Sequence, residues 1–192
     1  MPRVHVLEKI EKLFKNKGAS LYGGEAVTQE QHALQAAQLA EESGASPSII
    51  AAALLHDVGH LLHNLPDDAP DEGVDDVHEA LGDRFLRRWF GPEVSEPVRM
   101  HVDAKRYLCA VDPSYLGTLS PPSLQSLELQ GGPMKPAELS AYEELAFYEA
   151  SLVVRRWDDL AKDPNLATPP LAHYLPFLRE VLITPLAAEA TP

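Results

Sequence analysis

The chain has 192 residues, of which 45% are hydrophobic and 23% charged, a composition typical of one globular domain. No apolar run reaches the ~18 residues of a membrane span, so we expect no membrane-embedded segment. The net charge of −13 argues against nucleic acid and anionic membranes as partners, although a local pair of cations can still bind a small anion.

The first two predicted helices lie near the start of the sequence. Residues 4–14 place apolar side chains at the spacing of one helical face. A polar, glycine-containing loop follows over residues 15–24. Thr28 and Gln31 then have the spacing of a capping box, in which each side chain binds the other residue's backbone amide. We expect this box to open a helix over residues 28–42.

The helix predicted over residues 49–62, IIAAALLHDVGHLL, carries unusual polar residues. It follows a first-turn proline, Pro47, and is almost wholly apolar, so we expect it to be buried. Its last turns nevertheless contain His56, Asp57 and His60, with His60 four residues after His56 on the same face. Each of these groups would cost several kcal/mol if buried without a partner. Because a metal ion would compensate all three, this stretch predicts a metal site.

The rest of the chain is also expected to be helical. The predicted helices cover residues 77–90, 95–108, 121–129, 137–160 and 173–182. Residues 64–76 form an acidic loop, in which Asp75 or Asp76 caps the next helix, and residues 130–133 form a turn. Cys109 is the only cysteine, so we expect no internal disulfide and a reducing, cytoplasmic setting. The sequence therefore predicts an all-α, single-domain protein of seven or eight helices.

Six side chains of metal-ligand type stand in these predicted helices: His32, His56, Asp57, His78, His101 and Asp158. They exceed the four ligands of a structural zinc site. A carboxylate shared by two ions would use all six and leave open positions. Mixed nitrogen and oxygen ligands with open positions suit iron or manganese in redox or hydrolytic chemistry. On spacing alone, His5, His63 and His173 are equally available.

Five motifs extend this pattern: YGGEAVTQ at 22–29, LLHDVGH at 54–60, HVDAKRYL at 101–108, LQGGPM at 129–134 and RRWD at 155–158. The order His32, His56-Asp57 and Asp158 resembles the HD superfamily, which is named for that adjacent pair. The extra His78 and His101 are similar to the subset of the superfamily that binds two metals. HD alone is a weak signal, since most of that superfamily hydrolyses phosphates. The full set, over residues 22–174, resembles the HD-domain oxygenases that cleave the carbon–phosphorus bond of 1-hydroxy-2-aminoethylphosphonates.

The resemblance implies an HD-domain helical bundle, a single domain over residues 1–192 with its core at about 22–182. It also implies two iron ions in the mixed-valent Fe(II)/Fe(III) state. The implied ligands are His32, His56 and Asp158 for one iron, His78 and His101 for the other, and Asp57 as the bridge.

The same resemblance implies the residues around the substrate. The implied substrate-binding residues are His60, Lys105, Ser123, Ser126 and Arg155. Tyr22 would occupy the open iron position until the substrate binds, with Glu25 nearby. The implied reaction uses dioxygen to convert a 1-hydroxy-2-(amino or trimethylammonio)ethylphosphonate to inorganic phosphate and glycine or glycine betaine. The choice between a primary and a trimethylated amine stays open.

The spacing of two cations agrees with these roles. Lys105 follows His101 by one helical turn, and Arg155 precedes Asp158 by one turn. Both cations would therefore lie beside the metal ligands, where a dianionic phosphonate needs charged hydrogen-bond donors. Taken singly, each would be read as part of a surface salt bridge.

Two other functions compete with the oxygenase. A metal-dependent HD phosphohydrolase would use the same ligands to activate water against a nucleotide or another phosphate ester. The HVDAKRYL and LQGGPM motifs argue against it through resemblance. A non-enzymatic HD module would act as a ligand sensor, but such a module is expected to have lost ligands, and all six positions are filled here.

Overall fold

The fold was analysed in a computed structural model that describes residues 2–63, 73 and 75–183. Within these residues the chain forms α-helices and two short 3-10 helices and no strand longer than an isolated bridge, which confirms the all-α prediction. The elements are α1 Pro2–Lys17, α2 Gln29–Glu42, α3 Pro47–Leu55, η1 Val58–Leu61, α4 His78–Leu86, α5 Pro92–Val111, η2 Tyr115–Thr118, α6 Pro121–Leu129, α7 Pro136–Glu143, α8 Tyr148–Leu160 and α9 Leu171–Glu180.

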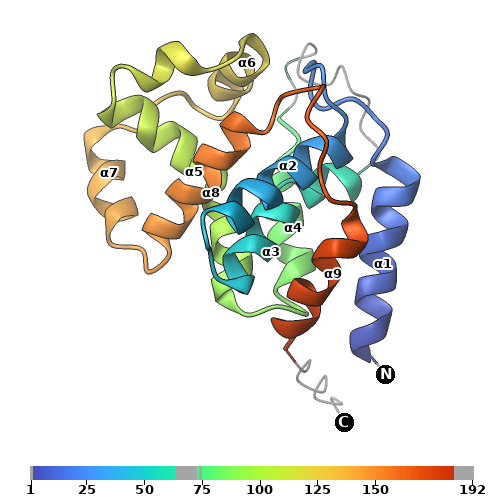
Figure 1. Cartoon of the computed structure of the whole chain (residues 1–192). Helices are drawn as coiled ribbons and strands as arrows, with labels where there is room; N and C mark the ends of the chain where they lie inside the picture. Colours follow the sequence, from blue (N-terminus) through green and yellow to red (C-terminus); the bar gives the residue numbers. More distant parts are fainter. Residues whose placement is uncertain (1, 64–72, 74, 184–192) are drawn as a thin grey trace.

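Helix α3 lies at the centre of the bundle and packs against α2, α5, α8 and α9 (Figure 1). Its residues between Ile50 and Leu55 are all at most 3% exposed, because apolar side chains cover its whole circumference. Helices α1 and α9 lie on one side of the centre, and α6 and α7 lie on the other. Among the described helices, none has both the length and the apolar character needed to cross a bilayer.

The capping box at the start of α2 is present as predicted. The amide of Gln31 donates to Thr28 Oγ1 at 3.2 Å, and the amide of Thr28 donates to Gln31 Oε1 at 2.9 Å. Because two backbone donors are satisfied at once, the start of α2 is well defined. This places His32 in the first turn of the helix, facing the core.

The prediction of a single helix over residues 49–62 is wrong. Helix α3 ends at Leu55, Asp57 leaves the helical region with φ −102° and ψ 15°, and a 3-10 helix follows. In this 3-10 helix, Gly59 lies so close to the start of α4 that a Cβ atom would be 1.9 Å from the carbonyl oxygen of His78. His60 therefore does not continue the helical face of His56.

The helix predicted over residues 137–160 is also interrupted. Helices α7 and α8 are separated by a turn in which the amide of Tyr148 donates to the carbonyl of Leu145 at 3.1 Å. The turn lets the hydroxyls of Tyr142 and Ser151 meet at 2.6 Å. Of the predicted acidic loop, residues 64–72 and 74 lie outside the described residues.

The remaining boundaries differ by a few residues from those predicted. Helix α4 starts at His78 and ends at Leu86, and α5 starts at Pro92 and includes Pro97. The N-cap of α4 is Val77, whose side chain makes no cap hydrogen bond, so neither Asp75 nor Asp76 is the capping residue that was predicted. The two carboxylates instead accept from the amides just before and at the start of the helix, Asp75 Oδ1 from Val77 and Asp76 Oδ1 from His78, each at 3.3 Å.

Candidate active site

The six side chains of metal-ligand type meet in one buried cluster: His32 on α2, His56 and Asp57 at the break after α3, His78 at the start of α4, His101 on α5 and Asp158 on α8. Each is at most 7% exposed. Five separate segments thus contribute, and the break between α3 and η1 turns the Asp57 carboxylate toward all the others.

The two carboxylate oxygens of Asp57 face different pairs of histidines. Its Oδ2 atom lies 3.4 Å from His32 Nε2 and 3.2 Å from His56 Nε2. Its Oδ1 atom lies 3.3 Å from the Nε2 atoms of both His78 and His101. The carboxylate therefore stands between two imidazole pairs, as a group that bridges two ions would.

Asp158 lies beside the first imidazole pair, His32 and His56. Its Oδ1 atom lies 3.3 Å from His32 Nε2, and His32, His56, Asp57 and Asp158 each present a ligand atom within 4.8 Å of the others. On the other side, the Nε2 atoms of His78 and His101 are 3.1 Å apart. His32, His56, Asp57 and Asp158 therefore form a group of four ligands. Asp57 also forms a second group of three with His78 and His101.

The imidazoles are oriented by their Nδ1 atoms. His32, His56 and His101 place Nδ1 at 2.7–2.8 Å from the carbonyl oxygens of Ala161, Ala53 and Val98, respectively. An Nδ1–H donated to a carbonyl leaves the Nε2 lone pair free for a metal. These three Nε2 atoms all point into the cluster.

A metal ion fits this donor set. Within the described part of the chain, neither Asp57 oxygen accepts a hydrogen bond of normal geometry, although the residue is only 5% exposed. Two ligands about 2.1 Å from one ion and at right angles lie about 3.0 Å apart, close to the 3.0 Å between the Nε2 atoms of His32 and His56. The cluster therefore has the chemistry and the spacing of a metal centre.

The charges of the clustered side chains depend on one another. Burial lowers the pKa of His78, but the nearby carboxylates of Asp57 and Asp76 outweigh it and raise the pKa to about 10. Burial lowers the pKa of His101 to about 4. Burial likewise opposes the charge on Asp57, but the surrounding imidazoles, His56 foremost, hold its pKa well below the usual value. The Asp57 carboxylate is therefore charged and lies among imidazoles, and carboxylate and imidazole groups are the donors that divalent metal ions bind.

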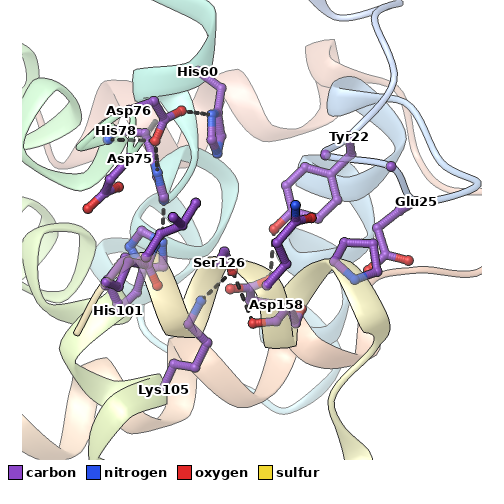
Figure 2. Close-up of a pocket in the computed structure, with 18 of the residues that line it drawn as sticks. Tyr22, Glu25, His60, Asp75, Asp76, His78, His101, Lys105, Ser126 and Asp158 are labelled. Carbon is purple, nitrogen blue, oxygen red and sulfur yellow. Dashed lines mark hydrogen bonds and ion pairs between the residues drawn. The ribbon is translucent and has the colours of Figure 1, made fainter. Parts of the chain in front are cut away.

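A cavity of about 370 Å³ opens beside the cluster, a size suited to a small ligand (Figure 2). All five predicted substrate-binding residues line it: His60, Lys105, Ser123, Ser126 and Arg155. Tyr22 and Glu25 close one side of it, and His78 and His101 of the metal cluster reach it from the other. The structure thus brings every predicted site residue to one place.

Lys105 is the main cation of this cavity. Its ammonium group donates to Ser126 Oγ at 2.8 Å, and the residue is only 3% exposed. Burial, assisted by the charge of Arg155, lowers the pKa of Lys105 to about 7. Among the described residues no carboxylate lies within hydrogen-bond distance of this ammonium group, an arrangement that favours an incoming anion.

Arg155 is held mainly by the protein. It donates to Asp158 Oδ2 at 2.6 Å, to the hydroxyl of Tyr115 at 3.1 Å and to Asp159. These bonds use one N–H of each guanidinium nitrogen, which leaves two of its five N–H groups outside these three bonds. Arg155 therefore fixes the Asp158 carboxylate in addition to lining the cavity.

The loop with Tyr22 and Glu25 covers the first metal-binding group. The ring of Tyr22 stacks on His32 at 3.8 Å, and its hydroxyl donates to Asp158 Oδ1 at 3.3 Å. Glu25 accepts from Lys162 at 2.8 Å and from Ser120 at 2.5 Å. Sequence reasoning missed Lys162, because no helical spacing relates a residue after α8 to this loop.

The structure places the three histidines that spacing alone had left as possible metal ligands, His5, His63 and His173. His173 lies at the surface beside Glu41, 2.9 Å from a carboxylate oxygen, and His5 is exposed. His63 lies near the cluster but contacts Asp76 and not Asp57. Sequence reasoning also missed the contacts of Asp76 with histidine side chains, since it treated this residue only as a helix cap.

Residues 30–162 match the family described as HD domain. The chain belongs to the HD-domain family. This HD-domain protein is also similar to two curated relatives over most of its length. It is 44% identical over 171 residues to hydroxymethylphosphonate dioxygenase from Gimesia maris, a match that covers 87% of this chain and 85% of the relative.

The second relative is [1-hydroxy-2-(trimethylamino)ethyl]phosphonate dioxygenase (glycine-betaine-forming) from Leisingera caerulea. It is 37% identical over 180 residues, which cover 94% of this HD-domain protein and 92% of the relative. Both relatives are named as phosphonate dioxygenases. The predicted resemblance to the phosphonate-cleaving HD oxygenases is thereby confirmed.

Proposed function

We propose that this HD-domain protein is an iron-dependent dioxygenase that cleaves the carbon–phosphorus bond of a 1-hydroxyalkylphosphonate. The observation that carries the proposal is the Asp57 carboxylate, whose oxygens face two imidazole pairs beside a cavity with a buried cation. By their names, both curated relatives act on phosphonates with a hydroxyl on the carbon bonded to phosphorus. That shared group is the part of the substrate we assign.

The proposed centre holds two iron ions in the mixed-valent state. The proposed ligands are His32, His56 and Asp158 for one ion, His78 and His101 for the other, and Asp57 for both. When bound, iron supplies the electron transfer and dioxygen chemistry for which this chain's side chains are not suited. The side chains supply binding, orientation and charge.

The cavity residues bind the phosphonate group. Lys105 provides a buried positive charge, and the hydroxyls of Ser123 and Ser126 lie on the same wall. Charge-assisted hydrogen bonds of this kind are about twice as strong as neutral ones. Arg155 adds a second positive charge next to Asp158. This arrangement holds carbon 1 of the substrate toward the metal cluster.

The overall reaction balances with dioxygen alone. A phosphonic acid R–CH(OH)–PO3H2 and O2 give the carboxylic acid R–COOH and phosphoric acid. The C–H and C–P bonds of carbon 1 break and supply the four electrons that O2 accepts, so no other reductant is needed. Hydroxymethylphosphonate would give formate, the trimethylammonio substrate glycine betaine, and the primary amine glycine.

The test measures dioxygen and phosphate together. Iron-loaded protein is mixed in a sealed oxygen electrode with hydroxymethylphosphonate or with either two-carbon amine, and phosphate is determined at intervals. We expect one O2 consumed per phosphate released with at least one of these substrates, and no turnover after iron is removed. Phosphate release at the same rate without oxygen would overturn the proposal in favour of a metal-dependent phosphohydrolase.

A further inference from the structure

The carboxylate of Asp76 accepts hydrogen bonds from three imidazoles. Its Oδ1 atom lies 2.8 Å from His78 Nδ1, and its Oδ2 atom lies 2.6 Å from His60 Nδ1 and 2.9 Å from His63 Nε2. Figure 2 shows Asp76 between His60 and His78, outside the metal cluster. One side chain thus contacts both a proposed metal ligand and a proposed substrate-binding residue.

This environment sets His78 apart from the other proposed imidazole ligands. His32, His56 and His101 all place Nδ1 against backbone carbonyl oxygens. Only His78, among these four, places it against a carboxylate. A carboxylate partner fixes the tautomer more firmly and makes the opposite nitrogen a better electron donor to a metal.

The backbone between Asp76 and His78 is in a strained conformation. Val77 has φ 45° and ψ 39°, in the left-handed region that β-branched residues rarely adopt. Such a conformation persists only where surrounding contacts favour it. Here it lets the side chains of Asp76 and His78 meet although they are two residues apart.

His60 and His78 are held as a pair by the same carboxylate. Their rings stack with centroids 4.0 Å apart and planes 19° from parallel. With both Nδ1 atoms directed to Asp76, each ring turns its Nε2 atom inward, 3.3 Å from Asp57 Oδ1 for His78 and 3.8 Å for His60. The orientation of one ring therefore depends on that of the other.

We propose that Asp76 is a positioning residue that holds His78 as a ligand of the second metal ion and His60 toward the substrate. The inference rests on the dinuclear centre of the proposed function. It predicts that Asp76 supports binding of one ion far more than of the other, since His32, His56 and Asp158 have no contact with it among the described residues. It also links occupancy of the second ion to the substrate cavity.

The experiment titrates Fe²⁺ without oxygen against a chromogenic chelator in wild type, Asp76→Asn and Asp75→Asn. Asp75→Asn is the matched control, because it removes the same charge one residue away. Asp75 lines the cavity and accepts from the amide of Val77, but among the described residues it has no hydrogen bond or ion pair with an imidazole. We expect two equivalents in wild type and in Asp75→Asn. Asp76→Asn should keep the first equivalent and bind the second roughly tenfold to hundredfold more weakly.

Each other result has a definite meaning. Unchanged affinity for both equivalents in Asp76→Asn would overturn the positioning role. Equal loss of both would assign Asp76 a general structural role and would also overturn it. Fewer than two equivalents in wild type would instead contradict the dinuclear centre itself, and the inference would fall with it.

A second measurement uses only the wild-type chain and so does not depend on how the variant folds. In Zn²⁺-loaded protein, ¹⁵N–¹H spectra of the histidine rings report which nitrogen carries the proton. We expect a proton on His78 Nδ1 and on His60 Nδ1, with His78 Nε2 bound to the metal. A proton on His78 Nε2, with Nδ1 as the metal ligand, would contradict the proposal.

Discussion

The Oδ1 atom of Asp57 lies 3.3 Å from Nε2 of His101, with both residues at most 5% exposed. Burial lowers the pKa of His101 to about 4, so the ring is neutral at pH 7. Its Nδ1 lies 2.7 Å from the carbonyl oxygen of Val98, and donation there leaves a lone pair on Nε2 directed at the carboxylate. Two electron-rich atoms held this close in a buried cluster are a donor pair suited to a metal ion.

Loss of the Lys105 ammonium should weaken substrate binding without affecting the metals. We expect Lys105→Ala to raise KM for the phosphonate and to lower kcat/KM roughly tenfold to hundredfold, the loss expected for about 1.5–3 kcal/mol of charged hydrogen bonding. Steady-state oxygen consumption at pH 6.5 measures this, together with iron content. Arg106→Ala is the control, since Arg106 points to Asp103 and Glu138. Equal effects of the two variants would contradict the assignment.

The pH profile gives an independent test of Lys105. Because burial lowers its pKa to about 7, the side chain is protonated below this pH and neutral above it. Only the protonated form attracts the anion, so this residue should contribute a decline in kcat/KM as pH rises through about 7. Lys105→Arg stays charged over this range. Dividing kcat/KM of the wild type by that of the variant at each pH removes the effect of substrate ionisation. A ratio constant from pH 6 to 9 would argue against this titration.

Tyr22 should control access of dioxygen to the reduced metals. Its hydroxyl lies at Asp158 while its ring stacks on His32, so Tyr22→Phe removes the hydroxyl and keeps the stacking. We expect normal iron loading, faster oxidation of the iron in air without substrate, and loss of any tyrosinate-to-iron(III) absorption band. Tyr107→Phe, which removes a hydroxyl bonded to Glu143, is the control. Wild-type oxidation rate and spectrum in Tyr22→Phe would rule out this role.

Gly59 should be required for the close packing of η1 on the start of α4. In Gly59→Ala the new Cβ would meet the His78 carbonyl oxygen at 1.9 Å, so backbone must move. We expect the free energy of unfolding to fall by about 1–3 kcal/mol and Tm to fall by roughly 2–12 °C. Gly117→Ala adds the same methyl group where no atom lies within 4 Å. Similar Tm values for the two variants in thermal unfolding would be inconsistent with this packing.

The local features of the fold were predictable from sequence. The capping box of Thr28 and Gln31 depends only on residues three apart, and the start of α6 depends on Ser120 and the prolines that follow it. The break after Leu55 was not predicted, and the segment that follows it packs at Gly59 against the backbone of His78, which is distant in sequence. Apolar periodicity alone continues the helix through this point.

The candidate site was also only partly predictable from the sequence. Resemblance brought together the six proposed ligands and the residues that line the cavity, and the structure places them side by side. Their roles as ligands and substrate-binding groups stay predictions. Asp76 and Lys162 were missed because each acts through contacts between segments that no periodic pattern relates.

The most direct test of a dinuclear centre bridged by Asp57 is a quantitative EPR spectrum. The protein is loaded with two equivalents of Fe²⁺ without oxygen, exposed briefly to limiting oxygen and frozen, and the signal is integrated against total iron. A coupled Fe(II)/Fe(III) pair has one unpaired spin in total, so we predict at most one spin per two iron atoms in wild type, with the coupled signal present there and absent from Asp57→Asn. A wild-type spectrum of isolated high-spin Fe(III) alone, with no more than one iron per chain, would contradict this account.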